Sequence, residues 1–124
     1  MIDDDPGVRS VVSRMLQRAG HHVIEGQDGR EGIARLRTTP IDLVLTDIVM
    51  PVMNGIEFIK MARQLSPSVK VIAMSGGGRT DKANCLQVAR EHGADATLQK
   101  PFTSADLQGL IARCFDAAAQ ETLA

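Results

Sequence analysis

The sequence is poor in aromatic residues and has no long apolar run. Three phenylalanines are its only aromatic side chains among 124 residues, with no tryptophan and no tyrosine. Proteins that bind single strands or RNA stack bases on such rings, so a base-stacking surface has little to be built from. No apolar run approaches the roughly 18 residues of a membrane span, and the opening MIDDD is not that of a signal peptide. These absences argue against a membrane protein and against a secreted one.

The sequence also has few cysteines and a small net charge. Cys85 and Cys114 form no CxxC pair and have no histidine at metal-ligand spacing, which favours reduced, partly buried thiols over a zinc site or a disulfide. Fourteen basic residues against fifteen acidic ones give a net charge of −1. A balance of that kind gives no broad attraction to nucleic acid or to an anionic membrane. We therefore expect a cytoplasmic protein that binds neither.

What is present is the composition of a single globular domain. Hydrophobic residues make up 44% of the 124 residues and charged residues 23%, which is ordinary for a folded, soluble chain. One domain takes roughly 150 residues, and a chain of this size can bury about two-thirds of its unfolded surface. We expect one domain over residues 1–124.

The hydrophobic pattern alternates between helical and strand-like periods along the chain. Apolar spacing of three and four predicts helices over residues 6–19, 29–37, 56–66, 79–92 and 103–118, and it places Val11, Leu65 and Phe115 on their inward faces. Short apolar segments predict strands at residues 22–25, 41–46, 69–74 and 96–98, with 41–46 buried on both faces. Strands that alternate with helices imply right-handed crossovers, so the expected fold is a doubly wound α/β sandwich of about five units.

The first strand of this pattern is short. Only Met1 and Ile2 stand before Asp3, where the alternation requires a buried strand. Either the chain begins late or residues were removed upstream. An interior strand this short is expected to cost stability.

Acidic side chains follow two of the predicted strands. Asp3, Asp4 and Asp5 come after the first strand, and Asp47 comes after the third. Ligands of doubly wound folds bind outside the carboxyl ends of the strands, so these carboxylates should lie together. They repel one another unless a cation sits among them, and oxygen ligands without histidine or cysteine suit Mg²⁺ best. Asp5 precedes a proline and is expected only to cap the following helix.

An ammonium and a hydroxyl follow two further strands. Ser75 ends the fourth strand and Lys100-Pro101 follows the fifth. Together they could hold an anion, most simply a phosphoryl group. Asp47 ends the most buried strand, which makes it the expected nucleophile for an aspartyl phosphate.

At these residues the chain resembles the receiver domain of two-component response regulators. The resemblance covers nearly all of the chain and implies a flavodoxin-like (βα)5 fold, with a central parallel sheet of order 2-1-3-4-5 and helices on both faces. The matching residues are, in order, Asp3-Asp4, Asp47 within DIVMPVMNG, Ser75 after VIAM, and Lys100-Pro101-Phe102.

The resemblance implies a phosphoacceptor and a metal site. Asp47 would take a phosphoryl group from a histidine kinase or a histidine phosphotransfer protein. Mg²⁺ would be held by Asp4 directly, by Asp3 through water, by Asp47, and by the backbone carbonyl of Val49.

The resemblance also implies roles around the phosphoryl group. Ser75 would turn toward it and Lys100 would pair with its oxygens, with a cis bond between Lys100 and Pro101. Pro51 and Gly55 would shape the loop after Asp47. Such a chain catalyses only its own phosphorylation and dephosphorylation, so it is not an enzyme in the usual sense.

One position departs from the pattern of the family. Receivers usually carry tyrosine or phenylalanine three residues before the lysine, where this chain has Thr97. The resemblance implies a downstream protein partner on the face formed by the fourth helix, the fifth strand and the fifth helix, yet Thr97 puts the usual relay to that face in doubt. No DNA-binding segment follows the last helix, so we expect a stand-alone regulator or a receiver cut from a longer protein.

Two alternatives belong to other classes. A pseudo-receiver would act as a phosphorylation-independent interaction module, although such a domain would lack the nucleophile or the lysine. An aspartate-based phosphatase would want a second acid two residues beyond Asp47, where Val49 stands.

Overall fold

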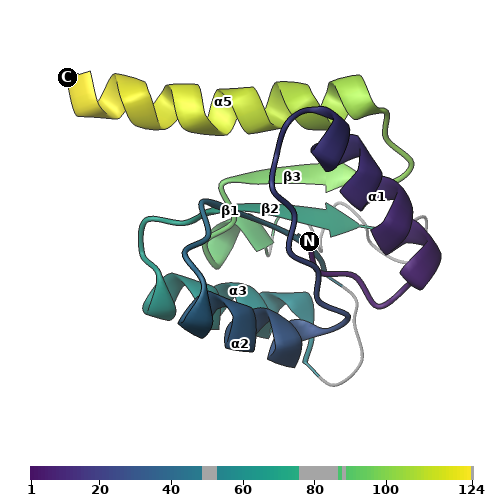
Figure 1. Cartoon of the computed structure of the whole chain (residues 1–124). Coiled ribbons are helices and arrows are strands. Elements are labelled where there is room, and N and C mark those ends of the chain that lie inside the picture. The colour runs from purple at the N-terminus through teal and green to yellow at the C-terminus, as the bar shows by residue number, and fades with distance from the viewer. Residues whose placement is uncertain (49–52, 76–86, 88, 124) are drawn as a thin grey trace.

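A parallel sheet lies between two layers of helices. The computed structural model describes residues 1–48, 53–75, 87 and 89–123. Figure 1 shows α1 and α5 on one face of the sheet and α2 and α3 on the other. This is the predicted α/β sandwich with helices on both faces. No helix among these described residues is both long and apolar enough to cross a bilayer.

Within the described residues three strands form the sheet, in the order β1-β2-β3, and all pairs are parallel. They are β1 (Leu43–Asp47), β2 (Lys70–Ser75) and β3 (Ala96–Gln99). Beyond β1, Ile2 forms single parallel bridges to Thr46 on one side and to Gly26 on the other. Counting these bridges, the order along the sheet is the predicted 2-1-3-4-5.

The predicted strand over residues 22–25 is reduced to the bridge at Gly26, which corrects the sequence prediction. The physical reason is that this segment has too little neighbouring backbone to pair with. Only Met1 and Ile2 lie between it and β1, and a strand needs a paired neighbour along its whole length to satisfy its backbone groups.

Four helices are described in full, and their ends follow the capping residues of the sequence. They are α1 (Pro6–Arg18), α2 (Gly29–Thr38), α3 (Gly55–Leu65) and α5 (Ser104–Leu123). The Asp5 carboxylate accepts from the amides of the first turn of α1 and Asp28 does so for α2, so both act as N-caps. The predicted helix over residues 79–92 falls mostly outside the described residues, which are helical at 87 and 89–91.

The core has two parts, one on each face of the sheet. Under α2 and α3 the largest fully buried side chain is Phe58, and under α1 and α5 the large fully buried side chains include Leu45, Ile72 and Met74. Three residues that the helical spacing placed inward are instead exposed, namely Val11 (54%), Leu65 (41%) and Phe115 (40%). The apolar faces predicted for these helices are therefore wider than the part of each helix that packs against the sheet.

Candidate functional site

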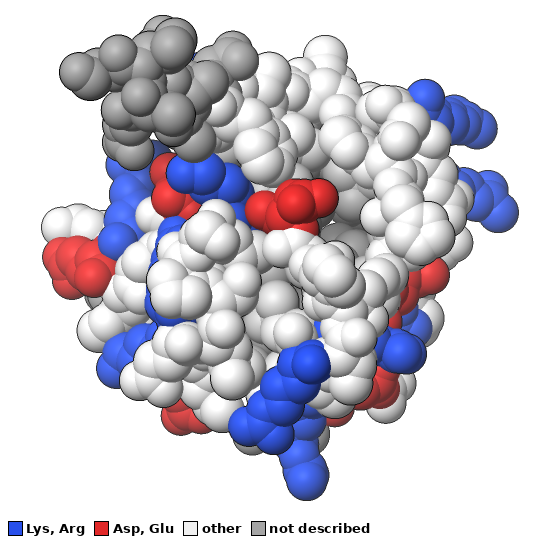
Figure 2. All heavy atoms as spheres, turned by 60° about the vertical axis from the view of Figure 1, so that its left-hand side comes forward, with Lys and Arg blue, Asp and Glu red and all other residues white. Residues whose placement is uncertain are grey.

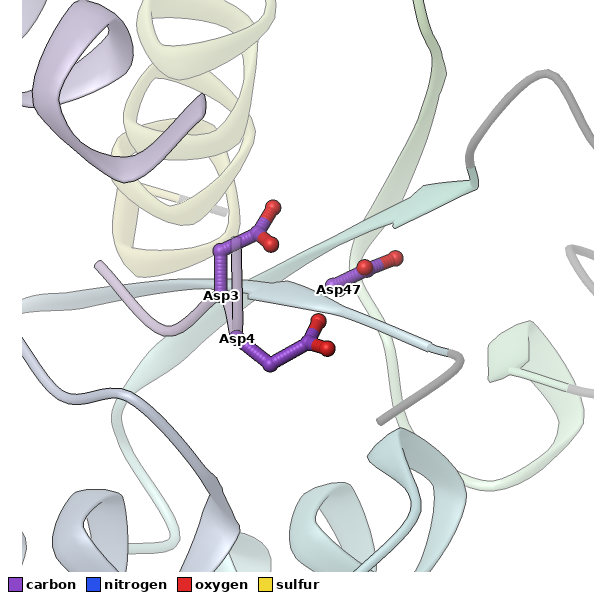
Figure 3. Close-up of side chains that lie close together, drawn as sticks. All are labelled: Asp3, Asp4 and Asp47. Atoms are coloured by element: carbon purple, nitrogen blue, oxygen red, sulfur yellow. The ribbon is translucent and has the colours of Figure 1, made fainter. Parts of the chain in front are cut away.

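Backbone hydrogen bonds bring Asp3 beside Asp47. The Asp47 amide donates to the Ile2 carbonyl at 2.9 Å, and the Ile2 amide donates to the Leu45 carbonyl at 2.8 Å. Asp3 and Asp4 therefore leave the sheet at the carboxyl end of β1, as the sequence predicted. In Figure 3 the carboxylates of Asp3, Asp4 and Asp47 all point to the same side of this sheet edge.

The three carboxylates form a compact group of oxygen ligands. One oxygen of each lies within 4.8 Å of the others. Asp3 is fully buried and Asp47 is 7% exposed, whereas Asp4 is exposed. A hard cation with few protein ligands and several waters fits such a set of donors, so the residues present suit Mg²⁺. Val49, the fourth predicted ligand, lies outside the described residues.

Lys100 follows the carboxyl end of β3, and its side chain faces this group of carboxylates. Its Nζ donates to Oδ2 of Asp3 at 2.7 Å and lies 3.5 Å from Oδ2 of Asp47. The bond from Lys100 to Pro101 is cis, as expected. The lysine side chain is 17% exposed. Its ammonium therefore stands between the most buried acid and the expected nucleophile, where it could also pair with an incoming anion.

Ser75 ends β2 at the same edge. It is 5% exposed and pairs in register with Gln99, next to Lys100. The Lys100 amide donates to the Ser75 carbonyl at 2.8 Å. All four groups that the sequence placed after strand ends thus share one edge of the sheet, because the strands are parallel.

Burial and charge act in opposite directions on the two central groups. Burial raises the pKa of Asp47 and the negative charge of Asp3 adds to this, while Lys100 and the hydrogen bond from the Ile48 amide oppose it; the net pKa lies above its ordinary value. Burial lowers the pKa of Lys100, but the hydrogen bond to Asp3 and the charges of Asp47 and Asp3 outweigh it, so that pKa is raised. Lys100 therefore stays protonated at neutral pH.

The raised pKa of Asp47 predicts that Asp47→Asn stabilises the metal-free fold. The folded state binds the Asp47 proton more tightly than the unfolded state does, so ionising this group costs stability as pH rises from 3.8 through the raised pKa. Above that window the variant should unfold at a higher temperature than the parent, and below pH 3.8 the difference should vanish. Thermal unfolding in EDTA at several pH values measures this, and a variant that is less stable at neutral pH would contradict it.

Two neighbours of the site were given no role there by the sequence, which indicated Asp5 only as a helix cap and did not distinguish Arg9. The Arg9 guanidinium on α1 donates to the Asp3 carbonyl at 2.8 Å, and the Asp5 amide donates to Oδ1 of Asp3 at 3.0 Å. Both fix the position of Asp3. Arg9 is one of many arginines on helix surfaces, so only the folded chain distinguishes it.

Thr97, the departure from the family pattern, is tied to a neighbouring helix. Its Oγ1 accepts a hydrogen bond of 3.0 Å from Nη2 of Arg90. Thr97 is half-buried on β3. In this chain a polar contact with Arg90 therefore occupies the position at which other receivers usually carry an aromatic ring.

Comparisons with known proteins agree on one family. The family description "Response regulator receiver domain" matches residues 1–112. The response regulator receiver protein CpdR of Brucella abortus is 34% identical over 119 residues, which cover 95% of this chain and 96% of that protein. A CheY-like receiver domain from Methanospirillum hungatei superimposes with a TM-score of 0.86 at 29% identity, covering 97% of this chain and 94% of the other.

Other relatives are longer proteins. The transcriptional regulatory protein CpxR of Escherichia coli is 33% identical over 111 residues, which cover 90% of this chain and 46% of that protein. The chain thus spans about half the length of such regulators, and their whole-protein activities are not carried over. Over the shared part, the match together with the strand-end acids and lysine places this chain in the response regulator receiver family, the phosphoacceptor domains of two-component signalling.

Proposed function

We propose that Asp47 is the residue that accepts the phosphoryl group, and that Lys100 and Ser75 bind its oxygens. The observation that supports this most is the meeting of three carboxylates with one ammonium at the carboxyl edge of the sheet. An anion placed there meets the nucleophile and the cation that would stabilise its charge.

A divalent cation belongs to this proposal. The carboxylates of Asp3, Asp4 and Asp47 would hold Mg²⁺, together with the backbone carbonyl of Val49. Their close spacing and the absence of nitrogen or sulfur donors among them support this metal. Bound Mg²⁺ would offset the charge of the carboxylates and polarise the oxygens of the phosphoryl group.

The phosphoryl transfer needs no reactant other than this protein and the phosphoryl donor. A carboxylate oxygen of Asp47 attacks phosphorus, and a new P–O bond forms as the bond to the donor breaks. The electron pair of the broken bond leaves with the donor, which is the imidazole of a phosphohistidine on a histidine kinase or phosphotransfer protein. Lys100, protonated because of its raised pKa, pairs with the transferred oxygens, and the Ser75 hydroxyl donates to one of them. Hydrolysis of the aspartyl phosphate would be the only other reaction.

Phosphorylation of the chain would be communicated to a protein partner that binds it. We place that partner on the face made by β3, α5 and the helix that precedes β3, where Arg90 and Thr97 lie. A net charge of −1 over the chain supports a protein partner over direct contact with nucleic acid. A cytoplasmic location, where two-component kinases phosphorylate their receivers, is part of the same proposal.

The test is the intact mass of the folded protein after incubation with Mg²⁺ and acetyl phosphate. We expect a single phosphoryl adduct that is lost in Asp47→Asn and in EDTA. Asp42→Asn, which removes an exposed acid at the opposite end of β1, should keep the adduct. A folded parent protein without an adduct would refute the proposal and favour a phosphorylation-independent interaction module.

A further inference from the structure

The Arg9 side chain joins three segments of the chain beside the carboxylate site. It extends from the first turn of α1, and its Nη1 donates to the Asp3 carbonyl at 2.8 Å. Its Nε lies 3.5 Å from Oε1 of Glu25. The next residue, Gly26, accepts from the Asp3 amide at 3.2 Å through its carbonyl. Arg9 therefore links α1 both to the acidic turn that follows Ile2 and to the segment beside that turn.

Charge alone does not distinguish Arg9 from the other basic side chains. The chain has fourteen lysines and arginines, and Figure 2 shows basic and acidic side chains interspersed among uncharged ones over one face of the molecule. A positive charge next to a cation site also weakens metal binding by repulsion, of which the pairing with Glu25 offsets a part. A favourable contribution of Arg9 to a metal site must therefore come from what it holds in place.

The carbonyl that Arg9 holds belongs to the peptide unit between Asp3 and Asp4. A peptide unit is planar, so a bond to its oxygen restrains the two dihedral angles beside it, ψ of Asp3 and φ of Asp4. The second of these angles sets the direction of the Asp4 Cβ. Among the residues that the structure describes, this peptide unit makes no other hydrogen bond. Arg9 is thus the contact that fixes the backbone between the two acids.

The Asp4 carboxylate depends on its backbone more than the other two carboxylates do. Lys100 donates to the Asp3 carboxylate at 2.7 Å. The Ile48 amide donates to Oδ1 of Asp47 at 2.9 Å. The exposed Asp4 carboxylate accepts no comparable bond from the described part of the chain. In Figure 3 it nevertheless points to the same side as the other two, so the direction of its backbone accounts for its place in the group.

We propose that Arg9 is a positioning residue for the metal site, which orients the Asp4 carboxylate toward Mg²⁺ by holding the Asp3 carbonyl. This inference rests on the metal site of the proposed function. Groups that orient a metal ligand from outside typically change metal affinity by about 10- to 100-fold when they are removed. Glu25 supports Arg9 in turn, because its carboxylate attracts the guanidinium at 3.5 Å and so limits the directions that the arginine can take.

The test is the Mg²⁺ dissociation constant of the whole chain, measured from NMR amide shifts in a titration without a phosphoryl donor. We expect Arg9→Met to bind Mg²⁺ about 10-fold more weakly than the parent. A role of charge alone predicts the opposite sign, since this variant removes a repelling cation. Arg14→Met is the matched control, because Arg14 is an exposed arginine on the same helix. Its affinity should stay within about 2-fold of the parent's, as salt screens exposed charges.

A double-mutant cycle tests whether Arg9 acts through Asp4. Circular dichroism at the titration temperature first establishes that each variant is folded. In Asp4→Asn, which already lacks the carboxylate that Arg9 orients, adding Arg9→Met should weaken binding by less than about 2-fold more. Equal losses in both backgrounds, or an Arg9→Met variant that binds Mg²⁺ as tightly as the parent or more tightly, would overturn the inference and leave the metal site standing. A parent chain that binds no Mg²⁺ would instead refute the metal site itself, and this inference with it.

Discussion

Gly55→Ala should lose about 3 kcal/mol of folding stability and most of its phosphoryl acceptance. A Cβ at position 55 would lie 2.4 Å from the Asp47 carbonyl oxygen and 2.5 Å from the Ile48 Cα. Both contacts are with backbone, which cannot rotate away as a side chain can. The Gly55 amide also donates to the Ile48 carbonyl at 2.7 Å, so the start of α3 is held against the end of β1. The methyl group must therefore displace the residue that we propose to be phosphorylated.

Denaturant unfolding and the acetyl phosphate adduct measure the two effects on the same sample. Gly109→Ala is the matched control, because a Cβ at this exposed position of α5 meets nothing within 4 Å. Alanine is the better helix former, so this variant should gain about 0.5–1 kcal/mol and keep the adduct. If Gly55→Ala matched the parent in both measurements, the close packing of α3 on β1 would not position Asp47.

Lys100→Met should slow adduct formation on the order of 10²-fold, the usual cost of removing one group that stabilises developing charge. It should also lower stability by about 2 kcal/mol, because fully buried Asp3 loses the ammonium 2.7 Å from its Oδ2. The loss is smaller than for a fully enclosed pair, since the lysine side chain is 17% exposed and Asp3 keeps the Asp5 amide.

Lys60→Met is the control for this change. Lys60 is exposed on α3, so its replacement should alter stability by less than about 0.5 kcal/mol and leave the rate of adduct formation unchanged. The rate is followed by intact mass at fixed acetyl phosphate and Mg²⁺. Should Lys100→Met form the adduct as fast as Lys60→Met does, the proposed contact between Lys100 and the phosphoryl oxygens would be refuted.

The site could be located from the sequence because its residues follow strands. Asp47, Ser75 and Lys100 each come directly after an apolar segment, and parallel strands bring their carboxyl ends to one edge. Local rules also sufficed for the caps at Asp5 and Asp28, since a short acidic side chain before a helix bonds to the first free amides. The roles of the site residues remain predictions until the adduct is measured.

Other features depended on contacts between distant segments. The strand expected at residues 22–25 failed to form beyond Gly26, because strand pairing depends on how much backbone the neighbouring segment offers and not on the segment's own composition. In the same way, helical spacing placed Val11 inward, but the extent of the sheet beneath α1 left it 54% exposed.

Hydrophobic period and strand-end residues, both local properties, determined the α/β class, the order of its elements and the edge of the sheet that carries the acids. Only the tertiary structure decided which charges pair. It buried Asp3 with Lys100, left Asp4 exposed and raised the pKa of Asp47. Burial and pairing are set by residues far apart in the chain, so no window of sequence contains them.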